Sequence, residues 1–226
     1  KIIGVDCHIG SQITEVQPFI DALERLSVLI GKLREAGDEI RYLDLGGGLG
    51  ITYEDETPPH PEVYAEALRE KVLELGVTLV LEPGRVIVGN AGAFITKVLY
   101  RKQQSGKLFA IVDGGMNDLM RPALYDAHHE ILPVVRDKKR LVSEMDVVGP
   151  ICESSDFLAR GRKLPEPNQG DLLAVMSAGA YGFTMSSNYN ARRRVAIVLV
   201  NGDSFDVIRE RESFEDLIRG EAIPDY

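Results

Sequence analysis

The sequence has few cysteines and lacks the long apolar segments of a membrane protein. Its two cysteines, Cys7 and Cys152, lie far apart, so we expect neither a disulfide framework nor a zinc site, and a reducing compartment is the simpler inference. No apolar run reaches the roughly 18 residues of a membrane span. No charged and then apolar leader is present at its start. We therefore predict a cytoplasmic protein with no membrane partner.

The sequence also has fewer basic than acidic residues. The sequence has 26 lysines and arginines against 35 aspartates and glutamates, a net charge of −9. The one basic cluster, Arg192, Arg193 and Arg194, adjoins a predicted strand. Because an acidic chain repels phosphate backbones, we expect no nucleic-acid partner. Its 226 residues, 44% hydrophobic and 27% charged, suffice for one large domain or two small ones.

The first 90 residues alternate between strand and helix patterns. Strands are expected at residues 2–6, 42–45 and 77–81. Thr14 and Gln17 have capping-box spacing at the start of the first helix, whose apolar face comprises Phe19, Leu23, Leu26, Ile30 and Leu33. Pro61 and Gly76 bracket the second helix. This order predicts a parallel sheet whose functional loops follow the strand carboxyl ends.

From about residue 91 to residue 226 the apolar period changes to two. Strands are expected at 94–100, 108–112, 131–135, 141–148, 172–176, 195–200 and 205–208. Ser213 and Asp216 start a short last helix. The predicted fold class is therefore α/β plus β, the second part a mostly antiparallel barrel or sandwich.

Three strand-helix units fall short of the eight in a closed TIM barrel. We therefore expect residues 1–90 to be part of a larger parallel sheet. An open parallel sheet would leave two unpaired edges. A missing N-terminal barrel segment or a second chain is expected to complete it.

Two loops have the residue types of an anion site. Gly46, Gly47 and Gly48 follow a predicted strand, so their backbone N–H groups either surround an anion or only form a tight turn. The spacing is not a dinucleotide fingerprint, because Ile51 stands where that pattern needs glycine. Arg85, in the run Glu-Pro-Gly-Arg after the third strand, suits an anion as well.

Two side chains at predicted strand ends suit a flat, protonated cofactor. Glu82 places a carboxylate where it would keep a pyridine nitrogen protonated; the alternative is a surface ion pair between Glu82 and Arg85. His8 follows the first strand, where its ring either stacks on a cofactor or is structural. Ser11 lies three residues beyond His8, and its hydroxyl is a candidate hydrogen-bond donor to a phosphate.

Cys152 follows an end-of-strand pattern at residues 146–150. We expect its thiol at a loop surface, where beside Glu153 it is a candidate general acid; the alternative is a small buried hydrophobic residue. His128 and His129 have no metal-ligating neighbours at the required spacing. We interpret them as a solvated turn and predict no metal site.

Seven segments, taken together and in order, resemble the ornithine, diaminopimelate and arginine decarboxylase family of pyridoxal-phosphate enzymes, which has the alanine racemase-like fold type. The resemblance covers the whole chain and is closest to the diaminopimelate-specific branch. The segments are His8-Ile9-Gly10-Ser11, Leu43-Asp44-Leu45-Gly46-Gly47-Gly48, Glu82-Pro83-Gly84-Arg85, Asp113-Gly114-Gly115-Met116, Arg121-Pro122-x-Leu124-Tyr125, Gly149-Pro150-x-Cys152-Glu153-Ser154 and Gly179-Ala180-Tyr181-Gly182.

The resemblance implies that residues 1–90 are the last βα units of a TIM-like barrel that binds the cofactor, pyridoxal 5'-phosphate. It also implies a homodimer with shared active sites. It implies that His8 stacks on the cofactor ring, that Glu82 pairs with its nitrogen, and that Cys152 of the second subunit reprotonates the α carbon. The implied phosphate-binding residues are Ser11, Gly47, Gly48, Gly84, Arg85 and Tyr181. The implied substrate-binding residues are Arg85, Arg121, Tyr125, Glu153 and Tyr181.

The activity implied is decarboxylation of meso-2,6-diaminopimelate to L-lysine and CO2. Arginine suits a distal carboxylate and would repel the terminal ammonium of ornithine. Relatives that act on ornithine carry aspartate after the cysteine, where this chain has Glu153. The alternatives are a decarboxylase of ornithine, arginine or carboxynorspermidine, or a catalytically dead relative that acts as a binding protein.

One family feature is not found in this sequence. The family's Schiff-base lysine lies on the first barrel strand, and no lysine here matches that motif. We therefore expect that lysine on the missing segment or second chain. This chain by itself is expected to be inactive.

Overall fold

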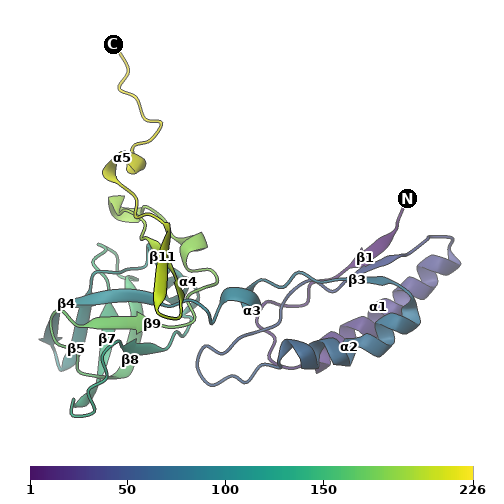
Figure 1. Cartoon of the computed structure of the whole chain (residues 1–226), viewed down its shortest axis with the longest axis horizontal. Coiled ribbons are helices and arrows are strands. Elements are labelled where there is room, and N and C mark those ends of the chain that lie inside the picture. Colours follow the sequence, from purple (N-terminus) through teal and green to yellow (C-terminus); the bar gives the residue numbers. More distant parts are fainter. Residues whose placement is uncertain (226) are drawn as a thin grey trace. The chain divides into compact units, whose positions relative to one another are not determined.

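The computed structural model describes residues 1–225. It divides the chain into two compact units, Lys1–Gly92 and the part from Ala93 on (Figure 1). The first unit contains β1 (Gly4–Asp6), α1 (Gln17–Glu35), β2 (Tyr42–Asp44), α2 (Pro61–Leu75), β3 (Thr78–Val80) and a short α3 (Arg85–Val88). Its strands form a parallel sheet in the order β1-β2-β3. Helices α1 and α2 lie together along this sheet (Figure 1).

The core of the first unit forms where the two helices meet. Phe19 of α1 and Tyr64 of α2 pack edge to face, with ring centroids 4.8 Å apart. Leu23 and Leu68 are buried beside them, and burying such a side chain stabilises the fold by about 1.5–3 kcal/mol. The predicted apolar face of α1 is therefore confirmed, with Leu26 and Leu33 partly buried against this core.

The helix ends agree with the sequence in one case and differ in the other. Helix α2 begins at Pro61 and ends before Gly76, which is left-handed (φ 61°) as expected of a C-terminal glycine. The capping box predicted for α1 is wrong. Val16 occupies the cap without a side-chain bond, and Gln17 lies inside the helix, where its amide donates to Asp21 at 2.8 Å.

The second unit contains a six-stranded sheet and a separate hairpin. The sheet has the order β6-β9-β4-β5-β7-β8 and is antiparallel except between β5 and β7. Its strands are β4 (Phe94–Gln104), β5 (Lys107–Val112), β6 (Ile131–Pro133), β7 (Val142–Val148), β8 (Phe157–Pro165) and β9 (Leu172–Val175). The other elements are α4 (Arg121–Tyr125), the 3-10 turns Phe183–Met185 and Tyr189–Ala191, the antiparallel pair β10 (Ile197–Asn201) and β11 (Ser204–Arg209), and α5 (Phe214–Leu217).

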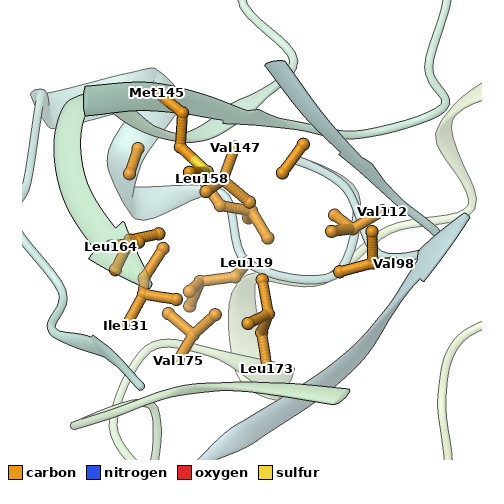
Figure 2. Close-up of a cluster of buried hydrophobic side chains, with 12 residues drawn as sticks. Val98, Val112, Leu119, Ile131, Met145, Val147, Leu158, Leu164, Leu173 and Val175 are labelled. Carbon is orange, nitrogen blue, oxygen red and sulfur yellow. The ribbon is translucent and has the colours of Figure 1, made fainter. Parts of the chain in front are cut away.

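This sheet curls around the unit's hydrophobic core. Its edge strands β6 and β8 approach each other, and Arg162 of β8 donates to the carbonyl of His129, two residues before β6, at 2.8 Å. Figure 2 shows the enclosed cluster, to which Leu119 contributes from the loop before α4. The predicted class, an α/β part followed by a mostly antiparallel β part, is confirmed. The capping box that starts α5 at Ser213 is also confirmed.

Strand β8 is the main element that the sequence pattern did not predict. Its first residues are buried, but Arg160, Gly161 and Arg162 then interrupt the alternation. Gly161 is left-handed (φ 56°), and its N–H donates to Asp146 at 2.8 Å. The pairing of β7 with β8 shifts register at this point, so a bulge conceals the strand's period. Within residues 1–225, no helix is long and apolar enough to span a membrane.

Candidate active site

The strand carboxyl ends of the first unit bring three predicted site segments together. Beyond the last paired residues, the Cys7 N–H donates to Asp44 O at 3.0 Å and the Glu82 N–H to Gly46 O at 2.8 Å. His8, the turn formed by Gly46, Gly47 and Gly48 (the glycine turn) and Glu82 therefore lie at one edge of the sheet. Parallel strands carry their functional loops at this edge.

The glycine turn requires glycine because backbone atoms approach it closely. A Cβ at Gly47 would lie 2.3 Å from the Glu82 carbonyl oxygen. A Cβ at Gly48 would lie 2.3 Å from the Gly10 carbonyl oxygen, and φ there is +104°. The Gly47 N–H points to His8, whose Nδ1 accepts it at 3.3 Å. The turn thus presents backbone instead of side chains beside His8 and Glu82.

Arg85 joins the turn after β3 to the loop after β1. Its Nε donates to the Ser11 carbonyl at 2.9 Å, and its guanidinium bonds the Tyr53 hydroxyl and lies 5.5 Å from the centre of that ring. Tyr53 is buried. It is a site residue that sequence reasoning missed, because it lies in an irregular stretch without periodicity.

Gln12 is a second missed residue of this region. Its Nε2 donates to the Ile51 carbonyl at 2.5 Å, and its Oε1 accepts from the Ile51 N–H at 3.1 Å. This pair of hydrogen bonds resembles the reciprocal backbone bonds between two paired strands, and it joins the loop after β1 to the loop after β2. It lies next to Ser11, so it also fixes the position of that residue.

In the second unit, Cys152 lies on the loop between β7 and β8. Its thiol is exposed, so the predicted loop-surface position is confirmed. The loop is fixed by Asp156, whose carboxylate accepts from the N–H of Ile151 at 2.6 Å and of Met116 at 2.7 Å. Burial raises the pKa of Asp156, against these two hydrogen bonds. Sequence reasoning missed Asp156, although it is four residues from Cys152.

Glu153 faces the segment around residue 189. The Tyr189 hydroxyl donates to Glu153 Oε2 at 3.3 Å. The Glu153 charge, and then partial burial, raise the pKa of Tyr189, with a smaller effect from Cys152. Tyr189 is therefore close to both residues and is another site residue that was not predicted.

Tyr181 lies on a strained loop. It is exposed and left-handed (φ 58°), a conformation that costs a non-glycine residue about 1–3 kcal/mol and concentrates at functional sites. The following Gly182 has no room for a Cβ, which would lie 2.4 Å from the Ala178 carbonyl. This loop connects to the segment before α4 through Ser187, whose N–H donates to Asn117 O at 2.9 Å.

The arginine cluster takes part in the same loop network. Arg192 donates to Asn117 Oδ1 at 3.1 Å and to the Asp113 carbonyl. Arg194 pairs with Glu212, its Nε 2.6 Å from Oε1. Segments 113–121, 149–156 and 177–192, defined here as the three-loop network, are thus joined by hydrogen bonds.

His129 corrects the prediction of a solvated turn. Its side chain is fully buried, and Nε2 lies 2.8 Å from Nη1 of Arg121, itself only 8% exposed. Burial, with the charge of Arg121 and other neighbours, lowers the pKa of His129 to about 4. Burial of His129 could not be inferred from residue pattern, because two adjacent histidines among polar residues also fit a surface turn. Tyr125, at the end of α4, is exposed.

This buried histidine predicts a loss of stability in mild acid. Its folded-state pKa of about 4 lies below the ordinary 6.5, so only the unfolded chain takes up the proton between these values. The free energy of unfolding should fall by about 3 kcal/mol from pH 7 to pH 4 through this group. Denaturant titrations between pH 7 and pH 4 should show a smaller decrease in the free energy of unfolding for His129→Gln than for wild type. An equal decrease in both proteins would contradict the lowered pKa of His129.

The structure groups the predicted site residues by unit. The first unit holds His8, Ser11, Gly47, Gly48, Glu82 and Gly84 on the loops after its three strands, and Arg85 at the start of α3. The second unit holds Arg121, Cys152, Glu153 and Tyr181 in the three-loop network, with Tyr125 four residues after Arg121 on α4. Within residues 1–225, no group of three His, Cys, Asp or Glu side chains is arranged to hold a metal.

Comparison with known proteins agrees with these features. Residues 11–179 match the family model described as "Pyridoxal-dependent decarboxylase, C-terminal sheet domain". The chain is 54% identical to a diaminopimelate decarboxylase of Haemophilus influenzae over 218 residues, covering 96% of this chain and 52% of that protein. It is also 54% identical to that of Pseudomonas aeruginosa over 223 residues, covering 99% and 53%.

Solved structures give the same result. Diaminopimelate decarboxylase from Helicobacter pylori, complexed with L-lysine, has a TM-score of 0.88 and 41% identity, covering 96% of this chain and 54% of that one. The chain thus spans about half the length of the curated relatives it matches. Through a match over most of its length, this chain belongs to the pyridoxal-dependent decarboxylase family.

Proposed function

We propose that the complete enzyme decarboxylates meso-2,6-diaminopimelate to L-lysine and CO2 with pyridoxal 5'-phosphate. The observation that carries this proposal is the three-loop network, which holds an exposed thiol, a carboxylate and a buried arginine in one unit. The relatives named above as diaminopimelate decarboxylases, one complexed with L-lysine, support the substrate. We further propose a cytoplasmic homodimer with shared active sites, and the two free thiols support a reducing compartment.

The residues at the strand ends of the first unit fit the cofactor. The glycine turn is a cradle that any Cβ would fill, and Arg85 offers a cation for a phosphate. We assign the phosphate to Ser11, Gly47, Gly48, Gly84 and Arg85, with Tyr181. His8 would lie against the ring and Glu82 would keep the ring nitrogen protonated. Bound there, the cofactor supplies an electron-withdrawing ring that weakens the bond to the departing carboxylate.

The second unit supplies the proton and the substrate contacts. When CO2 leaves, a proton must take its place at the α carbon, and Cys152 Sγ–H is the proposed donor. Arg121 would bind the distal carboxylate, since guanidinium and carboxylate form paired hydrogen bonds. Glu153 would accept from the distal ammonium, with Tyr125 and Tyr181 beside the substrate. Arg85 is a further candidate for the carboxylate.

The test is substrate choice by the complete protein. We expect lysine and CO2 in equal amounts from meso-2,6-diaminopimelate and no decarboxylated amine from ornithine or arginine, measured by chromatography of the products. A decarboxylated amine from ornithine or arginine, or the decarboxylation product of carboxynorspermidine, would favour the other decarboxylases. Tight ligand binding without any product would favour the binding-protein alternative.

A further inference from the structure

The hydrogen bonds of His129 show which of its two ring nitrogens carries the hydrogen. Nδ1 lies 2.8 Å from the Met176 carbonyl oxygen, which only accepts, so Nδ1 carries the hydrogen. Nε2 lies 2.8 Å from Nη1 of Arg121, which only donates, so Nε2 is the acceptor. The imidazole is therefore neutral and contacts a backbone carbonyl on one side and a guanidinium on the other.

The main chain around this imidazole is held firmly. The His129 carbonyl accepts from Arg162 of β8 at 2.8 Å. The Met176 N–H donates to the Glu130 carbonyl at 2.8 Å, extending the pairing of β6 with β9. The main chain of His129, which carries the ring, and Met176, which accepts from Nδ1, are thus both held by hydrogen bonds to neighbouring segments. The ring itself is fully buried.

This arrangement has a consequence for Arg121. A long arginine side chain has many rotamers, and ordering it at the moment of binding weakens affinity. A fixed acceptor orders the guanidinium in advance. Because the acceptor is neutral, this contact leaves the arginine's charge in place, whereas a carboxylate at the same point would cancel it.

We propose that His129 is a positioning residue that orients Arg121 toward the distal carboxylate of the substrate. The inference rests on the proposed function and deepens it, because it names the group that prepares the carboxylate-binding arginine. His129 acts through Arg121 and touches no reacting atom. Its loss should therefore raise KM and leave kcat nearly unchanged.

Two variants separate the two hydrogen bonds of the imidazole. The side chain of His129→Gln reaches the Nε2 position and keeps an acceptor for Arg121, whereas His129→Asn reaches only the Nδ1 position and keeps the donor to Met176. In the complete enzyme, His129→Asn should raise KM for meso-2,6-diaminopimelate about tenfold, the size of one lost hydrogen bond to a charged group. His129→Gln should stay within about threefold of wild type by the same reasoning.

A binding measurement separates positioning from a general structural defect. L-Lysine keeps the distal carboxylate of the substrate, whereas cadaverine has none. His129→Asn should weaken inhibition by L-lysine about as much as it raises KM, and inhibition by cadaverine should not change. The matched control is His60→Asn, the same change at an exposed histidine that caps α2; it should alter inhibition by neither L-lysine nor cadaverine.

The outcomes are distinguishable. Equal increases in KM for the two His129 variants, or parallel weakening of L-lysine and cadaverine, would overturn the inference while lysine release by wild type upholds the proposed function. If His129→Asn does not fold, as judged by circular dichroism, His129→Gln decides alone, and a KM raised by more than about threefold would overturn the role. If wild type releases no lysine, the proposed function fails and this inference fails with it.

Discussion

Replacing Cys152 with alanine is expected to lower kcat of the complete enzyme by at least about 100-fold, the usual effect of losing a general acid. The thiol is exposed, and Asp156 holds its loop through two backbone N–H groups. The change therefore removes the proton donor without moving the loop. The measurements are the rate of lysine release and the absorbance of bound cofactor, which should stay at the wild-type level.

The control for this variant lies on the same loop. Ser154 is exposed two residues after Cys152, so Ser154→Ala changes a side chain of similar size without touching the proposed proton donor. Its kcat should match that of wild type. If Cys152→Ala also turns over at the wild-type rate, Cys152 has no part in the mechanism.

Gly47→Ala should abolish cofactor retention in the complete enzyme. The new Cβ would lie 2.3 Å from the Glu82 carbonyl oxygen, so either the glycine turn or the backbone of Glu82 must move. Such overpacking costs about 1–3 kcal/mol or more, and it displaces both the phosphate cradle and Glu82. Cofactor content per protomer, from absorbance after desalting, should fall at least tenfold (about 1.4 kcal/mol in affinity).

Gly31→Ala is the matched control for this prediction. Gly31 lies inside α1, and nothing lies within 4 Å of its added Cβ. The substitution should raise stability by about 1 kcal/mol, because alanine is the better helix former, and should leave cofactor content unchanged. A Gly47→Ala enzyme that retains full cofactor would show that this turn is not the phosphate cradle.

Much of the fold could be predicted from residue pattern. The apolar stripe of α1 and the Pro61 and Gly76 limits of α2 were correct, because helix period and backbone preference are local properties. The placing of His8, the glycine turn and Glu82 at one sheet edge also followed, since parallel strands end together. The exposed thiol of Cys152 followed from the end of the strand before it.

Other features required contacts between distant segments. Strand β8 was hidden because the bulge at Gly161 breaks its alternation and depends on Asp146 of the neighbouring strand. Asp156 resembles any loop aspartate until the segment around Met116 supplies its N–H. The capping box of α1 was a local pattern that the fold did not use.

The sequence alone determined the two-part architecture, the strand-end loops and the residue types available for chemistry, because periodicity and turn residues act over a few positions. Only the tertiary structure decided which polar side chains are buried and what they contact. His129 is the clearest case. Its neighbours in sequence suggest a surface turn, whereas its contacts with Arg121 and Met176, 8 and 47 residues away, make it a neutral buried imidazole.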